Sequence, residues 1–521
     1  MFLILSLVLV IYSLIYYYFR HKFSYWKRRG VETYPARFPF GHLGEFYLNK
    51  KSYIEIFTQY YDQSKSEFCG IYQGIDPLLI VKNLEDIKYV LVKNFNCFMN
   101  RGIHTDVNNN FLSEHLFRIE DEQWKNLRNK LSPAFTSGKL KAMFETINQC
   151  GNGLEYALNK AMDPKTGDIN VQMLVQRYTV DVISSVGFGV EANSLKDNYA
   201  SPIFNLSQEI VVRKSLHSFL IKLAFFGPSY AKILYNFFSE GSKETRQSFL
   251  SMVNNIVESR EKNKITRKDF LQLLIELKNH GKIDSSNDSL DNADVFDKKD
   301  SLNFEFSMKT FVSQVFVFYF AGFDTSALTL TMMLYYLAEN QNIQKRLRKE
   351  IDECLKKHNN ELTYDGVMEM EYLEMVLSET LRLRPVLGHL VRVCNKECYL
   401  PSSNLKIDVG TNICIPVYNI QRDEKYFPNP NKFDPERFSK ENILKIPNFA
   451  YLPFGDGPRF CIGLRLGKLQ TKMGLIAILR NHTVHLSDKT KISNYAPEYV
   501  ILKPKEHVIL SFRKYISTEK E

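Results

Sequence analysis

Apolar residues recur along most of this chain at helical spacing, and the strongest such stretch covers residues 304 to about 348. It is rich in Phe, Val, Leu and Met, and its polar residues lie mainly at its two ends. A helix that is apolar nearly all round is a buried one. The stretch therefore predicts a long central helix inside a mostly helical body.

A short polar segment, residues 321–326, lies within this apolar stretch. Gly322 costs about 1 kcal/mol in a helix interior, and the side chains of Asp324, Thr325 and Ser326 compete for backbone hydrogen bonds. The segment therefore predicts an interruption of the helix. The pattern alone leaves two interpretations open: a functional site, or a kink where another helix crosses.

Three shorter stretches have the alternating or β-branched character of strands. They cover residues 77–82, 406–416 and 499–512, toward the two ends of the chain. The predicted fold class is therefore mainly α with a small β portion.

The beginning of the chain differs from the rest, because residues 1–19 contain no charged side chain. A helix of about 18 or more apolar residues is long enough to cross a bilayer. Arg20 and Lys22 follow at once, and positive charge after the span predicts that the rest of the chain stays in the cytosol. A cleaved signal peptide is the alternative, but its usual positive start and small-residue cleavage site are missing. We therefore expect residues 1–19 to be a transmembrane anchor.

A basic, proline-containing linker, residues 20–41, follows the expected anchor. Pro35 and Pro39 cannot continue a helix, so the linker is either a stiff hinge or a plain connection. No repeat divides the remainder, and we expect residues 42–521 to form a single domain.

Composition and charge exclude several classes of protein. The chain is 44% hydrophobic and 24% charged, which is ordinary globular composition. A net charge of +10 is small for 521 residues, and without a dense basic block we expect no nucleic acid as a partner. Eight scattered cysteines argue against a disulfide scaffold. The sequence has no dinucleotide fingerprint, so a nicotinamide electron donor would have to act through another protein.

The most informative stretch, residues 454–463, reads FGDGPRFCIG. It closely resembles the haem-binding loop of the cytochrome P450 family, F-G-x-G-x-R-x-C-x-G, at all six specified positions. The resemblance implies that Cys461 is the thiolate ligand of a haem iron, in a loop that includes Phe454 and Gly455. A thiolate donates electron density to iron and favours cleavage of the O–O bond. The alternative, a structural buried cysteine, leaves the other five positions unexplained.

The expected surroundings of Cys461 suit a thiolate. Residues 462–479 have a helical pattern, so Cys461 lies at a helix N-terminus, where the helix dipole stabilises negative charge. Glycines let backbone N–H groups approach the sulfur. Arg459, two residues away, can reach a haem propionate as a charge-assisted pair.

Other motifs upstream also match the family. Trp124 and Arg128 fit its W-x-x-x-R helix, whose two side chains meet a haem propionate. Arg392 matches a further propionate-binding arginine, and Arg101 is one more candidate. An exposed amphipathic helix would give the same spacing of Trp124 and Arg128.

Glu379 and Arg382 fit the family's E-x-x-R motif, and Arg437 lies in a P-E-R-F segment. The resemblance implies that these three side chains form a buried charged cluster, which persists only if every charge is paired. Its role would be structural, to fix the segment that carries the cysteine loop. Taken alone, the Glu–Arg spacing is also common on exposed helix surfaces.

The polar segment 321–326 resembles the family's A-G-x-[D/E]-T. This implies a long helix over the distal face of the haem, where Thr325, with Asp324 beside it, passes protons during oxygen activation. Several family members that act as isomerases or dehydratases lack this threonine, so Thr325 favours a monooxygenase.

The resemblance covers residues 31 to 512 and is greatest to the insect microsomal detoxification branch. It implies that residues 42–521 form a haem b enzyme that inserts one oxygen atom of O2 into lipophilic small molecules, on the cytosolic side of the endoplasmic reticulum membrane. Electrons would come from NADPH–cytochrome reductase, with cytochrome b5 as an optional second donor, near Lys125, Lys130 and Lys468. Two alternatives stay open: a haem-thiolate isomerase or dehydratase, and a non-catalytic haem-based binder.

Overall fold

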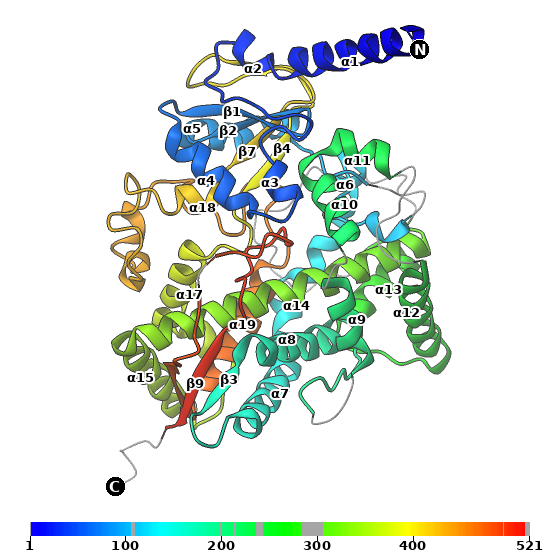
Figure 1. Cartoon of the computed structure of the whole chain (residues 1–521). Coiled ribbons are helices and arrows are strands. Elements are labelled where there is room, and N and C mark those ends of the chain that lie inside the picture. The colour runs from blue at the N-terminus through cyan, green and yellow to red at the C-terminus, as the bar shows by residue number, and fades with distance from the viewer. Residues whose placement is uncertain are drawn as a thin grey trace.

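Helices form most of the body (Figure 1). The computed structural model describes residues 2–105, 110–196, 201–211, 215–235, 243–283, 306–492 and 494–515. The longer helices of the body are α4 (Tyr53–Gln63), α6 (Asp121–Leu131), α7 (Ser137–Ala161), α8 (Val171–Phe188), α9 (Pro202–Val211), α10 (Ser215–Phe226), α12 (Lys243–Asn263), α13 (Phe270–His280), α14 (Met308–Glu339), α15 (Gln341–Lys357), α17 (Glu371–Leu383) and α19 (Leu464–Leu479). The shorter helices are α2 (Tyr25–Arg28), α3 (Gly44–Tyr47), α5 (Leu84–Lys88), α11 (Pro228–Leu234), α16 (Tyr364–Glu369) and α18 (Val417–Ile420). The predicted fold class is confirmed.

Helix α14 is the predicted central helix, and Figure 1 shows it running through the middle of the body. It begins after Ser307, whose hydroxyl accepts a hydrogen bond from the Thr310 amide, as an N-cap does. The expected end near residue 348 is wrong. The backbone leaves the helical region at Asn340, whose side-chain amide donates to the carbonyl of Tyr336, and α15 starts as a separate helix.

The predicted interruption at residues 321–326 is also wrong, because α14 is helical throughout them. The Thr325 hydroxyl donates to the carbonyl of Ala321 one turn earlier, at 2.7 Å, so it is satisfied without breaking the helix. Gly322 marks a crossing of helices instead. A Cβ atom on it would lie 2.4 Å from Cδ1 of Ile183 on α8.

The four-stranded sheet has the order β1-β2-β7-β4. Its strands are β1 (Phe68–Gln73), β2 (Asp76–Val81), β7 (Asn412–Ile415) and β4 (Leu390–Val393). The predicted strand at 77–82 corresponds to β2. The one at 406–416 divides at a turn in which Gly410 has a φ of +85°, so that β6 (Lys406–Ile407) pairs with β5 (Cys398–Tyr399) in another sheet.

The third sheet lies at the other end of the body and has the order β3-β9-β8. Its strands are β3 (Asp168–Asn170), β9 (Ile509–Lys514) and β8 (His482–Leu486). The strand predicted at 499–512 is therefore a strand only in its last part. The residues before it form a hairpin that enters the interior of the body, as described below.

Helix α1 (Phe2–Lys22) projects away from the body in Figure 1, and none of its residues is buried. It is long and apolar enough to cross a membrane, as is the mostly buried α14. The segment that follows α1 is attached to the four-stranded sheet. The Trp26 ring is fully buried against Gly70, and its indole N–H donates to the carbonyl of Ile71 at 2.9 Å.

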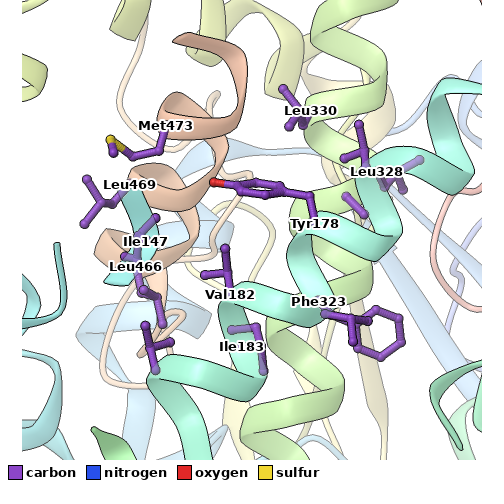
Figure 2. Close-up of a cluster of buried hydrophobic side chains, with 14 of the residues drawn as sticks. Ile147, Tyr178, Val182, Ile183, Phe323, Leu328, Leu330, Leu466, Leu469 and Met473 are labelled. Atoms are coloured by element: carbon purple, nitrogen blue, oxygen red, sulfur yellow. The ribbon is translucent and has the colours of Figure 1, made fainter. Parts of the chain in front are cut away.

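The core beneath α14 depends on close approaches between helices. Figure 2 shows Tyr178 of α8 reaching across between Leu330 of α14 and Met473 of α19. The Tyr178 hydroxyl donates to the carbonyl of Gln470 at 2.9 Å. A Cβ atom at Gly474 would lie 2.7 Å from the Tyr178 ring and 2.6 Å from Leu330, so the three helices meet with no space for a side chain there.

Gly474→Ala is therefore expected to destabilise the protein, although Ala is the better helix former. The added methyl group forces Tyr178 or Leu330 to move, at a cost of about 1–3 kcal/mol. The thermal unfolding midpoint should fall accordingly. Gly153→Ala on α7 is the control, because its Cβ would make an ordinary contact, 3.5 Å from Leu195, and should raise the midpoint slightly. Equal shifts in the two variants would contradict the close packing.

Candidate active site

A large cavity lies inside the body between α14 and the loop that carries Cys461. Its volume is about 1280 Å³, and its walls include Phe316 and Thr325 on one side and Cys461 on the other. Ligand pockets of proteins usually measure about 300–1,000 Å³. This cavity therefore has room for a flat prosthetic group and a small molecule together.

The loop before α19 places Cys461 at the wall of this cavity. Gly455 and Gly457 have left-handed backbone angles, with φ of +76° and +68°, and a Cβ on Gly457 would lie 1.9 Å from the carbonyl oxygen of Leu91. These two positions therefore require glycine. The Cys461 amide donates to the carbonyl of Phe454 at 2.9 Å, which closes the loop.

The Cys461 thiol has electropositive surroundings. Burial raises its pKa, while the amide of Gly463 and the guanidinium groups of Arg128 and Arg101 act in the opposite direction. Cys461 lies just before the first turn of α19, as predicted, so the helix dipole adds to this effect. A bound metal ion deprotonates a coordinating thiol outright. The site thus suits a thiolate ligand.

Four arginines line the same cavity, the buried Arg128, Arg392 and Arg459 and the half-buried Arg101. Burial and the neighbouring guanidinium groups lower the pKa of Arg459 to about 7 and that of Arg101 to about 9. Burial alone lowers the pKa of Arg392 to about 10. Such a concentration of buried positive charge is costly unless an anion offsets it.

The hydrogen bonds of these arginines are incomplete. Arg459 donates to the carbonyls of Met99 and Ile119, at 2.8 and 2.9 Å, and Arg392 to that of Val391. Nη1 of Arg459 and Nε of Arg392 are buried without a hydrogen-bond partner among the described residues. Both observations fit the two propionates of a haem, since guanidinium groups form charge-assisted bonds with carboxylates.

The predicted W-x-x-x-R pair belongs to this cluster. Helix α6 buries both Trp124 and Arg128. The Arg459 guanidinium lies 4.1 Å from the Trp124 ring centre, and Arg128 donates to the carbonyl of Phe460 at 3.1 Å. The structure thus brings together all the residues that the resemblance assigned to haem binding, including Phe454 and Gly455.

On the opposite wall, Asp324 and Thr325 occupy adjacent positions of α14. Asp324 is nearly buried, and each of its carboxylate oxygens has a partner. Oδ2 lies 2.7 Å from Nζ of Lys503, and Oδ1 accepts a bond from the side-chain amide of Gln176 at 3.1 Å. Sequence reasoning missed both Lys503 and Gln176. Neither lies in a motif, and no periodic pattern links either of them to Asp324.

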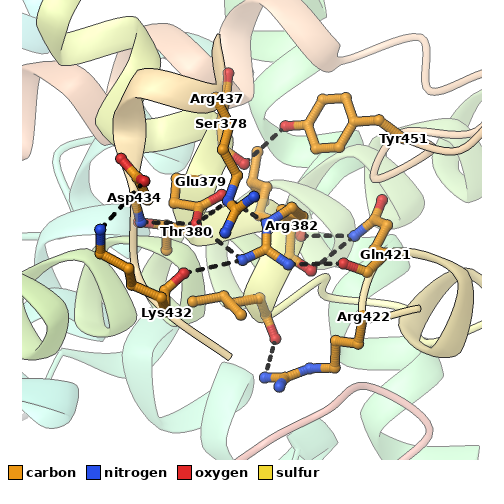
Figure 3. Close-up of polar contacts among 12 residues, drawn as sticks. Ser378, Glu379, Thr380, Arg382, Gln421, Arg422, Lys432, Asp434, Arg437 and Tyr451 are labelled. Carbon is orange, nitrogen blue, oxygen red and sulfur yellow. Dashed lines mark hydrogen bonds and ion pairs between the residues drawn. The ribbon is translucent and has the colours of Figure 1, made fainter. Parts of the chain in front are cut away.

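The three structural residues also meet. Figure 3 shows the side chains of both Arg382 and Arg437 pointing toward Glu379. Arg382 donates to both Glu379 oxygens, at 2.6 and 2.8 Å, and Nε of Arg437 lies 3.5 Å from Oε1. Burial raises the pKa of Glu379, and the hydrogen bonds and charge of Arg382 oppose this shift.

This charged cluster ties α17 to the segment before the cysteine loop. Arg382 donates to the carbonyl of Gln421, and the Asp434 amide donates to Glu379, at 2.7 and 2.8 Å. The side chain of Gln421 in turn accepts a bond from the Leu452 amide at 2.9 Å. The bonds therefore run from the cluster to within a few residues of Phe454.

Many of the residues that line the cavity are apolar, among them Phe316, Phe320, Val386, Leu390 and Tyr499.

The lysines expected to meet an electron donor have acidic or backbone partners. Lys125 lies 3.8 Å from Glu122, and Lys130 donates to the carbonyl of Gly281 at 3.3 Å. Lys468 forms a short ion pair with Glu374. The positive charge near the α6 and α19 side of the body is therefore partly offset by carboxylates.

Comparison with known proteins is consistent with this geometry. Residues 34–512 match the family model described as Cytochrome P450. The chain is 39% identical to Cytochrome P450 6k1 of Blattella germanica over 92% of this chain and 90% of that protein. It is 37% identical to Probable cytochrome P450 6a13 of Drosophila melanogaster over 94% of both chains. It is 35% identical to Cytochrome P450 6d3 of Musca domestica over 92% of this chain and 93% of that protein.

Glu379→Gln tests the buried charged cluster. The change leaves the Arg382 and Arg437 cations without their carboxylate, and removal of one partner of a buried pair costs about 3–5 kcal/mol. We expect a lower thermal midpoint and a lower ratio of haem to protein after purification. The control is Glu353→Gln, because the exposed Glu353 lies 3.7 Å from Lys349 and such pairs contribute about 1 kcal/mol or less. A Glu379→Gln protein as stable as this control would contradict the prediction.

Proposed function

The chain belongs to the cytochrome P450 family and is a haem-thiolate monooxygenase, and we propose that it oxidises lipophilic small molecules with electrons passed from NADPH by a reductase. The observation that carries the proposal is the cavity itself. Cys461 and four arginines line one wall of it, and Thr325 and several apolar side chains line the other.

The residues of the wall that contains Cys461 would hold the prosthetic group, which we propose is haem b. When bound, a thiolate-ligated haem supplies an electron-rich iron that favours cleavage of the O–O bond. Cys461 would hold the iron through its thiolate. Arg459, Arg392, Arg101 and Arg128 would bind the propionates, and the Trp124 ring orients Arg459 by stacking on its guanidinium group.

The residues of α14 would handle protons. The Thr325 hydroxyl donates to the Ala321 carbonyl. During the reaction it would release this bond and donate into the cavity instead. Asp324 lies beside it, with its carboxylate oriented by Gln176 and Lys503. The apolar walls keep bulk water away, so that protons arrive through these side chains.

The substrate would be lipophilic, because many of the side chains that line the cavity with Thr325 are aromatic or aliphatic. His389 also lines the cavity, and burial lowers its pKa to about 3, so it contributes a neutral ring at physiological pH. A pocket of this kind favours apolar molecules with few polar groups.

The N-terminal helix and the basic side chains support the remaining parts of the proposal. Residues 1–19 would anchor the chain in the endoplasmic reticulum membrane, and residues 42–521 would form the catalytic domain on the cytosolic side, joined to the anchor by residues 20–41. NADPH–cytochrome reductase, with cytochrome b5 as an optional second donor, would dock near Lys125, Lys130 and Lys468.

The first test is the absorption spectrum of the purified, reduced and CO-bound protein. A strongly red-shifted Soret band is expected from an intact thiolate ligand. The Cys461→His protein should lose this shift, and an unchanged spectrum in that variant would remove Cys461 as the ligand.

Turnover with reductase, NADPH and O2 tests the activity. Oxygenated product should form from lipophilic compounds and should fall strongly in Thr325→Ala. Turnover of organic peroxides without reductase would indicate an isomerase or dehydratase instead. Haem and ligand binding without any product would indicate a binder.

A further inference from the structure

Residues 494–505 form a hairpin whose tip enters the cavity. The Lys505 amide donates to the carbonyl of Asn494 and the Ala496 amide to that of Lys503, at 3.0 and 2.9 Å. Residues 499–501 form the loop that these two bonds close, and all three line the cavity. The tip therefore forms part of the wall that a substrate would touch.

Among the described residues, hydrogen bonds and an ion pair join the hairpin to other elements at three points, and the Tyr495 ring also contacts Tyr418 and Arg384. The Leu502 amide donates to the carbonyl of Val386, at 2.9 Å, and the Ser218 hydroxyl of α10 donates to that of Glu498 at 3.0 Å. The third point is the ion pair of Lys503 with Asp324 on α14. It is the one that connects the hairpin to the residues proposed to handle protons.

This ion pair is buried, because the side chains of Lys503 and Asp324 are 5% and 6% exposed. The Lys503 ammonium also lies 4.8 Å from the ring centre of Tyr499, at the tip of its own hairpin. A single cation thus contacts both the substrate-lining tip and the carboxylate next to Thr325.

Stability alone does not require a buried ion pair at this place. Apolar residues of similar volume are often equally stabilising, because two desolvated charges repay their cost only with good geometry and further hydrogen bonds. Asp324 meets that condition through Gln176, whose amide occupies the second carboxylate oxygen. The pair has one property that an apolar contact lacks: it fixes the direction of a carboxylate.

We propose that Lys503 is a positioning residue that couples substrate contact to proton handling. Its ion pair holds the hairpin tip against α14 and orients Asp324 beside Thr325, so that a substrate packed against residues 499–501 acts on that carboxylate through the same cation. The part that concerns protons rests on the monooxygenase function proposed above, whereas the part that concerns the hairpin does not.

Hydrogen exchange of the full-length haem-loaded protein tests the hairpin part. In Lys503→Met, the amides of Ala496 and Leu502 should exchange about tenfold faster or more, because loss of one partner of a buried pair destabilises its surroundings. Amides of β9 should be unchanged. Lys503→Arg keeps the charge and should restore most of the protection. Lys505→Met, an exposed position on the same hairpin, is the matched control.

Exchange in Lys503→Met equal to that in Lys505→Met would overturn the proposal. If Lys503→Met does not fold, the nearly isosteric Asp324→Asn removes the same ion pair. It should then give the same faster exchange at Ala496 and Leu502, and unchanged exchange there would overturn the proposal in that case too.

The ratio of product formed to NADPH consumed tests the proton part. It should fall several-fold in Lys503→Met, recover in Lys503→Arg and stay at the wild-type value in Lys505→Met. Faster exchange with an unchanged ratio would overturn the coupling to proton handling. If no variant and no wild-type sample forms product, the monooxygenase proposal fails, and the exchange result still decides the role of Lys503 in the hairpin.

Discussion

An interior cavity of about 1280 Å³ is the constraint on which the rest of this structure depends. A site that must hold a prosthetic group and a small molecule keeps its shape only if the elements around it are rigid. Here the helices behind the walls pack so closely that a single added Cβ atom would clash at some points. Gly322 and Gly474 mark two such approaches, between α14 and α8 and at the meeting of α8, α14 and α19. The close packing of these helices thus gives the site rigid walls.

Charge is managed differently in two buried clusters. Around Glu379 the positive groups of Arg382 and Arg437 face a carboxylate of the chain itself, so the charges of this cluster compensate one another and it can act as a structural joint. At the cavity wall, the charge of Glu120 offsets only part of the effect of burial on Arg459, and Nη1 of Arg459 and Nε of Arg392 lack hydrogen bonds among the described residues. Incomplete compensation is what a binding site for an anionic group requires. The residues around Glu379 therefore stabilise the fold, whereas the arginines of the cavity wall would bind an anionic group.

The segment between α17 and α19 connects the Glu379 cluster to the cysteine loop through a series of hydrogen bonds. Glu379 and Arg382 fix Asp434 and Gln421, Gln421 binds Leu452, and the loop that follows is closed by the bond from the Cys461 amide to Phe454. The irregular backbone of this region is therefore held in place at several points by hydrogen bonds. A sulfur that must meet an iron within a few tenths of an ångström needs support of this kind.

The sequence by itself determined the features that arise from local chemistry. The glycine and arginine positions around Cys461, the E-x-x-R pair and the apolar stretch of α14 each lie within one short segment. The resemblance of the first two to family motifs, and the apolar spacing of the third, were therefore enough to predict them. Polar residues 321–326 predicted a break in α14 that did not occur. The Thr325 hydroxyl donates to a carbonyl within the helix, and the absence of a side chain at Gly322 lets α8 pack closely there. Tertiary structure alone decided that Lys503 meets Asp324. A lone lysine carries no pattern, and only the path of the folded chain brings that hairpin against α14.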